Sequence, residues 1–237
     1  MKNFLIATFV FFALNNSFTE GVEIKTISTW TDVSYKYIVL LFGDSAICTG
    51  ALANENTVYT SAHCVCDYQT IKRIRVGATD TGREGYTRMI LERFLLHNKH
   101  SCTNGNFIKA INDPSGTDLA ALKIIPVDTT WDVAYLKYSA DPEKNTQVIL
   151  AGYGSQSLEE TEGKYIGVCN RGTITDDALC VEIDGHGDFG FAGLMVDAQD
   201  PSQAYGVLSG YFEDHTNVVV AYSSLSKHDN FLKLYLS

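Results

Sequence analysis

The segment Thr-Ser-Ala-His-Cys at residues 60–64 decides the fold of this chain, together with two segments that follow it in order. Residues 118–124 read Asp-Leu-Ala-Ala-Leu-Lys-Ile, and residues 187–190 read Gly-Asp-Phe-Gly. The first segment offers an imidazole, His63, and the second a carboxylate, Asp118. An imidazole oriented by a buried carboxylate is the arrangement that activates a hydroxyl nucleophile.

In this order the three segments resemble the trypsin/chymotrypsin family of serine proteases. In that family a Thr-Ala-Ala-His-Cys segment holds the general base, an Asp-Ile-Ala-Leu-Leu segment holds the orienting carboxylate, and Gly-Asp-Ser-Gly-Gly-Pro holds the nucleophile. The resemblance covers residues 22–237 of the chain. It implies an all-β fold, with two six-stranded antiparallel β-barrels of the chymotrypsin type and a C-terminal helix.

Other segments support the resemblance independently. Residues 151–154 (Ala-Gly-Tyr-Gly) are similar to the family segment that opens the second barrel, and residues 206–209 (Gly-Val-Leu-Ser) to the strand after the nucleophile. Short apolar runs bounded by Gly, Asn and Asp also favour an all-β barrel or sandwich. These runs predict strands at residues 37–42, 57–60, 73–76, 119–125, 147–151, 205–208 and 218–222.

Only the C-terminus has the pattern of a helix. Ser226 can cap it, and Leu225, His228, Leu232 and Tyr235 recur on one face at helical spacing. A long polar stretch at residues 98–117 is instead expected to be a surface loop, and loops of this length often carry function.

The N-terminus indicates the compartment. Lys2 precedes an apolar run at residues 4–14 that is too short to span a bilayer, and polar residues follow it. We read residues 1–21 as a cleaved signal peptide, with a buried N-terminal segment as the alternative, and residues 22–237 as one protease-like domain of two barrel halves. The mature protein is therefore expected to be secreted and extracellular.

The six cysteines of the chain indicate a disulfide framework, since an even number is typical of secreted proteins. The resemblance implies the pairs Cys48–Cys64 and Cys169–Cys180. A third pair, Cys66–Cys102, has no common counterpart in the family. It would tie down the start of the polar loop, either for stability or to present a rigid binding surface.

The overall charge narrows the classes of partner. The formal net charge is −10, which argues against binding to nucleic acid and to anionic membranes. The densest basic group, Lys-Arg-Ile-Arg at residues 72–75, is interpreted as a solvated strand face. The cysteine and histidine spacing does not match a metal site, so neither metal nor cofactor is expected.

The nucleophile is missing from this pattern. Phe189 stands at the serine position, so we expect no proteolytic activity and interpret His63 and Asp118 as a hydrogen-bonded pair left from ancestry. The resemblance assigns the oxyanion-hole donors to the backbone of Gly187 and Phe189. The sequence of residues 190–193 (Gly-Phe-Ala-Gly) is bulkier than the family pattern and one residue longer.

The positions of the specificity pocket also depart from the family. Ser209, Gly210 and Tyr211 replace Ser-Trp-Gly, which places a large ring where a glycine leaves room for substrate. The alternative is that Tyr211 is a surface aromatic residue. The base of the pocket is assigned to either Ile183 or Asp184.

The activation segment is altered as well. Family proteases are cut before an Ile-Val-Gly-Gly sequence, whose new amine enters the interior and pairs with the aspartate before the nucleophile. Residues 22–25 read Val-Glu-Ile-Lys here, while that aspartate, Asp188, is retained. Signal cleavage after Gly21 is a second route by which Val22 could supply an amine.

These observations predict a secreted, monomeric pseudoprotease that acts by binding a protein. The resemblance extends to inactivated mite protease paralogues related to group 3 allergens, which implies a partner in host defence, such as a complement component. Two alternatives stay open: a regulatory cofactor of a protease cascade, and a residual hydrolase that uses His63 with another hydroxyl.

Overall fold

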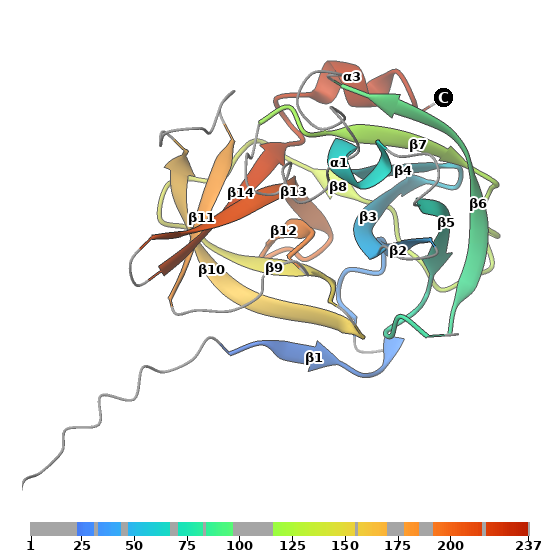
Figure 1. Ribbon diagram of the computed structural model, residues 1–237, viewed down its shortest axis with the longest axis horizontal. Helices are drawn as coiled ribbons and strands as arrows, with labels where there is room; N and C mark the ends of the chain where they lie inside the picture. The colour runs from blue at the N-terminus through green and yellow to red at the C-terminus, as the bar shows by residue number, and fades with distance from the viewer. Residues whose placement is uncertain are drawn as a thin grey trace, which may run out of the picture.

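A computed structural model describes ten segments of the chain, and its strands form two β-barrels that lie side by side (Figure 1). The segments are residues 23–30, 33–43, 47–66, 71–82, 84–96, 116–154, 156–169, 178–184, 192–214 and 217–236, without the side chains of 213 and 214. None of the helices described within these segments is long and apolar enough to cross a membrane.

The first barrel is closed by six antiparallel strands in the order β2-β3-β4-β7-β6-β5. Along these strands, alternate apolar side chains such as Val39, Leu41 and Ile74 point inward and form its core. The strands are β2 (Ile38–Gly43), β3 (Ile47–Asn54), β4 (Thr57–Thr60), β5 (Ile71–Val76), β6 (Tyr86–Leu95) and β7 (Ala120–Ile124).

The second barrel follows the order β9-β10-β11-β14-β13-β12, and the pairing of β9 with both β10 and β12 closes it. Its strands are β9 (Gln147–Tyr153), β10 (Leu158–Val168), β11 (Leu179–Asp184), β12 (Leu194–Asp197), β13 (Gln203–Asp214) and β14 (Asn217–Ser224). Two short strands lie outside the barrel: β1 (Lys25–Ile27) pairs with β10, and β8 (Lys137–Tyr138) pairs with β13. The fold is therefore the one that the resemblance implied.

The C-terminal helix is shorter than the sequence pattern predicts. α3 spans Asp229–Lys233 and begins after His228, whereas residues 225–228 form a turn. Ser226 does not cap the helix, because its hydroxyl donates a hydrogen bond of 2.9 Å to the carboxylate of Asp141. A second short helix, α1 (Ala62–Val65), was not predicted.

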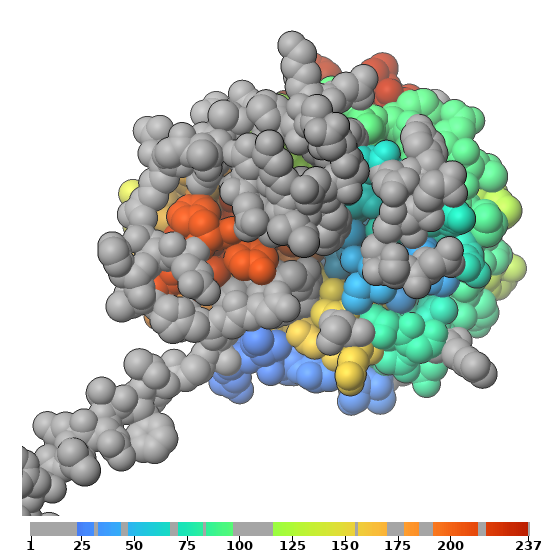
Figure 2. All heavy atoms as spheres, viewed as in Figure 1, coloured from blue at the N-terminus to red at the C-terminus, as the bar shows by residue number. Residues whose placement is uncertain are grey.

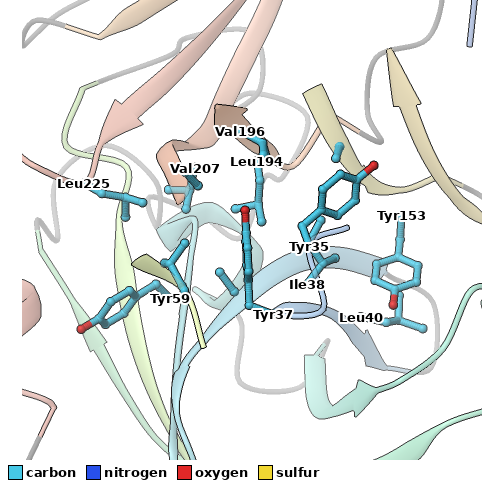
Figure 3. Close-up of a cluster of buried hydrophobic side chains, with 14 of the residues drawn as sticks. Tyr35, Tyr37, Ile38, Leu40, Tyr59, Tyr153, Leu194, Val196, Val207 and Leu225 are labelled. Carbon is cyan, nitrogen blue, oxygen red and sulfur yellow. The ribbon is translucent and has the colours of Figure 1, made fainter. Parts of the chain in front are cut away.

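The barrels share a core of aromatic and aliphatic side chains at their junction (Figure 3). Tyr37 and Tyr59 from the first barrel pack in the same cluster as Tyr153 from the second. Thr49 on β3 adds a polar link, because its hydroxyl accepts a hydrogen bond of 2.9 Å from the backbone N–H of Tyr153. Apolar burial at this scale stabilises a fixed arrangement of the two barrels, so a site between them has a defined geometry.

Candidate functional site

His63 and Asp118 are brought together by the pairing of two adjacent strands. In the β4–β7 ladder, Thr60 lies opposite Ala120. His63 follows the end of β4 by three residues, in α1, and Asp118 precedes β7 by two. Because the strands are antiparallel, the end of one and the start of the other lie at the same edge of the barrel.

The carboxylate of Asp118 binds His63 at two points. One oxygen lies 2.5 Å from the ring Nδ1, and the other accepts a hydrogen bond of 2.9 Å from the backbone N–H of His63. Both side chains are buried, with 2% of the imidazole and 4% of the carboxylate exposed. A carboxylate on Nδ1 fixes the orientation and tautomer of the imidazole, which is the positioning that a general base requires.

Two hydroxyls lie close to this pair in sequence or fold, and both are buried. Ser61 follows β4, and its hydroxyl donates a hydrogen bond to the backbone carbonyl of Leu208 on β13 of the second barrel. Ser209 is the extra residue of a bulge in β13, between Leu208 and Gly210, and is fully buried. Neither hydroxyl is exposed to a substrate in solution.

The family match agrees with this geometry, because residues 26–228 fit the trypsin family over most of the chain. The chain belongs to the trypsin family of serine proteases. Among curated relatives, a snake venom serine protease from Trimeresurus stejnegeri, KN11, is 26% identical over 148 residues, and KN3 from the same snake is 29% identical over 152. Each match covers 62% of this chain, which spans about half (54%) of the relatives' length.

Two solved structures share the fold at low sequence identity. A Glu endopeptidase in complex with MPD superposes with a TM-score of 0.66 and 17% identity, covering 91% of this chain and 98% of that one. The scabies mite inactivated protease paralogue S-I1 superposes with a TM-score of 0.63 and 18% identity, covering 85% and 95%. At this identity the two structures establish the fold alone.

The predicted pocket positions of this trypsin-family chain do not lie together: some face the core of the second barrel and one faces its outer surface. Ile183 on β11 points into the barrel core, where Tyr211 from β13 packs partly buried against the same cluster. Asp184 is exposed at the end of β11, beside a groove on the outside of the barrel. Gly210 is buried next to the bulge at Ser209.

The described part of the activation segment lies on the surface. Residues 23–26 are exposed, and β1 lies along the edge of β10 rather than entering the interior. Two contacts hold it there: the hydroxyl of Thr161 donates to the carbonyl of Glu23 at 2.9 Å, and Lys25 pairs with Glu160 at 2.6 Å.

Each barrel contains one disulfide between described cysteines. Cys48 is bonded to Cys64, next to His63, and Cys169 is bonded to Cys180. Cys66 is also disulfide-bonded, and its predicted partner, Cys102, lies outside the described residues.

Within the described segments, one cluster has metal-ligand spacing: Cys48, His63 and Cys64. The two sulfurs of this cluster are bonded to each other, so the thiolates that a metal ion needs are absent.

Several predicted site residues fall outside the described segments. These are Gly187, Asp188 and Phe189, together with residues 190–191, most of the polar loop at 98–117 and the predicted signal peptide at 1–21. For these positions only the residue type in the sequence is used. One surface feature of the first barrel was not predicted from the sequence, and it involves β6 and the arginines of β5.

Proposed function

We propose that this chain is a catalytically inactive trypsin-family protein that acts by binding another protein. The observation that carries the proposal is in the sequence: Phe189 stands at the nucleophile position of a chain whose His63–Asp118 pair is in place. A phenyl ring has no atom that can attack a peptide carbonyl. In a serine protease of another fold, loss of the nucleophile lowers kcat by a factor on the order of 10⁶.

The surroundings of the pair support the proposal. The imidazole of His63 is almost completely buried, so little of it is accessible to the hydroxyl of an external molecule. Ser61 and Ser209, the two neighbouring hydroxyls, are buried as well. In a folded protein of this kind, the pair stabilises the edge of the first barrel instead of supporting turnover.

Secretion is the second part of the proposal. The apolar run at residues 4–14, with Lys2 before it, has the composition of a signal peptide, and the domain that follows is disulfide-bonded. Expression in a secretory host is expected to release the protein into the medium with an N-terminus close to residue 22. N-terminal sequencing checks this, and a full-length chain retained in the cell would contradict it.

The catalytic part is tested by a paired assay on the secreted chain and its Phe189→Ser variant. Both are treated with a fluorophosphonate probe and a broad peptide library, with an active trypsin as the positive control. The unaltered chain is expected to show neither labelling nor cleavage. Labelling of the variant alone would mean that Phe189 is the only block and that the cleft still accepts peptides.

The outcome that overturns the proposal is turnover by the unaltered chain that is lost in a His63→Ala variant. Such a result would establish a hydrolase that uses His63 with another hydroxyl.

The protein partner is sought separately, by incubating the immobilised chain with host plasma and identifying what binds. A defence or complement component is the expected class, and acceleration of a second protease would instead indicate a cascade cofactor.

A further inference from the structure

A row of four side chains crosses the outer face of the first barrel. Phe42 on β2 lies opposite Arg73 on β5, and Arg73 lies opposite Met89 on β6. The backbone N–H of Ile125 bonds to the carbonyl of Met89 at 3.0 Å, beside the Ile90–Ile124 pair, so Ile125 continues the row. Directly opposed residues of paired strands share a face, so these side chains form one continuous surface, the outer row.

The outer row is accessible. Its inward-facing neighbours, such as Ile74, fill the barrel core, whereas 45% of Met89 and 42% of Ile125 are exposed. Arg73 is also exposed. β6 lies at the edge of the molecule farthest from the second barrel (Figure 1, Figure 2).

The apolar part of this surface extends beyond the row. Leu91 is the extra residue of a bulge in β6, which lies between the Ile90–Ile124 and Glu92–Lys123 pairs, and it is 59% exposed. Large apolar side chains that adjoin one another on a surface indicate an interaction site more strongly than scattered ones do.

Basic side chains stand in the same surface. The guanidinium carbons of Arg73 and Arg75 lie 5.3 and 4.6 Å from the centre of the Phe42 ring. In the described part of the chain, neither arginine forms an ion pair with a carboxylate. The nearby carboxylate of Asp80 instead accepts a hydrogen bond of 2.5 Å from the backbone of Gly82.

The two arginines are held in place before any partner arrives. Arg75 donates to the backbone carbonyls of Thr81 and Gly82, which fixes its guanidinium over one ring, Phe42. A cation–π contact orients Arg73 over the same ring. Pre-organised guanidinium groups lose little conformational freedom on binding and match the geometry of a carboxylate.

We infer that the outer row is a docking surface for an acidic segment of a partner protein. Carboxylates of that segment pair with Arg73 and its neighbours, and its apolar side chains pack on Met89 and Ile125. The inference deepens the proposed function, because it names the class of partner that the binding protein takes. Charge complementarity carries it: among the described residues, Arg73 and Arg75 have no ion-pair partner, in a chain whose formal net charge is −10.

The apolar half of the row favours a polypeptide over a sulfated polysaccharide. A sulfated sugar would pair with Arg73 and Arg75 but has no apolar side chains to cover Met89 and Ile125. A second copy of this chain is the other competitor, because Glu162 and other acidic residues of β10 and β11 line a groove on the second barrel.

The test uses a fluorescein-labelled peptide of Asp, Glu and Leu residues as the probe and measures its Kd by anisotropy. Arg73→Glu is expected to weaken binding by at least about tenfold, as expected when a charge-assisted contact is replaced by repulsion. Met89→Ser is expected to weaken it several-fold. The matched control is Lys144→Glu, the same charge change at an exposed turn of the second barrel, which should leave the Kd unchanged.

Each other outcome overturns the inference. Equal effects of Arg73→Glu and Lys144→Glu would mean that net charge alone governs binding. Binding of a heparin oligosaccharide but not of the peptide would assign the row to sulfated glycans. A concentration-dependent dimer that Arg73→Glu abolishes, without peptide binding, would assign it to a second copy. None of these results depends on turnover, so the inference and the inactivity of the chain fail separately.

Discussion

One carboxylate, that of Asp118, contacts both the ring and the backbone of His63, at 2.5 Å and 2.9 Å. The two contacts close the edge of the first barrel where β4 ends and β7 begins. In an active protease this geometry orients a base, and here it also satisfies two buried donors. The pair therefore has a structural value that does not depend on catalysis.

Asp118→Ala is expected to lower the free energy of unfolding by about 3 kcal/mol, because it leaves buried polar groups of His63 without their acceptor. Urea denaturation measures the loss. The double variant with His63→Ala should cost less than the sum of the single variants, since the residues interact directly. Asp132→Ala, which removes an exposed carboxylate, serves as the control and should cost less than about 1 kcal/mol. Additive single effects would argue against the coupling.

Strands could be predicted from the sequence where their apolar residues form a clear local pattern. They were missed where a bulge or small and polar inward residues obscure that pattern. β4 spans the predicted residues 57–60. β6 was missed because the bulge at Leu91 interrupts the alternation of inward and outward side chains. β10 was missed because its inward positions include Thr161 and Gly163, which give no apolar signal. Gly163 leaves no room for a larger residue, because a Cβ at this position would lie 2.4 Å from the side chain of Val181.

The site was predicted through the family resemblance rather than through local pattern. His63 and Asp118 are 55 residues apart, and no periodicity of a single sequence could pair them. The outer row was read only as a solvated strand face at residues 72–75. Its members come from β2, β5, β6 and the end of β7, so the register of four strands was needed to place Arg73 beside Met89.

Gly193 is required by the close approach of the two barrels. A Cβ at this position would lie 2.2 Å from the Cβ of Thr49 on β3. Gly193→Ala is expected to destabilise the fold by about 1–3 kcal/mol, as overpacking does in a buried site. In a Thr49→Gly background the same substitution should cost much less, because the obstructing atoms are gone. Thermal unfolding of the four proteins gives both values, and an equal cost in the two backgrounds would rule out this contact as the cause.

The disulfide between Cys48 and Cys64 closes a loop with a sequence separation of 16. Replacement of both cysteines by alanine is expected to lower the free energy of unfolding by about 3 kcal/mol, chiefly because the unfolded chain gains freedom. Urea denaturation of this variant beside a Cys169→Ala/Cys180→Ala variant tests the value. The second loop, with a separation of 11, should contribute slightly less. No measurable loss at the first bridge would contradict the expectation.

Buried tyrosines make the fold sensitive to alkaline pH. Burial raises the pKa of the phenols of Tyr37, Tyr153 and Tyr222 well above the ordinary value near 10. Their hydroxyls donate to backbone carbonyls, as Tyr222 does to Ala192 at 3.0 Å, which they can do only while protonated. Above pH 10 the unfolded chain therefore binds fewer protons than the folded chain, so the free energy of unfolding falls as the pH rises.

The expected slope is about 1.4 kcal/mol per pH unit for each tyrosine that stays protonated in the folded state. Urea denaturation between pH 8 and pH 12, with phenolate absorbance followed in parallel, measures it. Tyr222→Phe should be less stable at pH 8 because Ala192 loses its donor, yet its stability should fall less steeply above pH 10. The lost hydrogen bond lowers the stability of the variant at every pH, whereas removal of the titrating phenol makes its stability fall less steeply above pH 10. The two contributions can therefore be separated. An unchanged slope in the variant would mean that Tyr222 ionises without unfolding of the barrel.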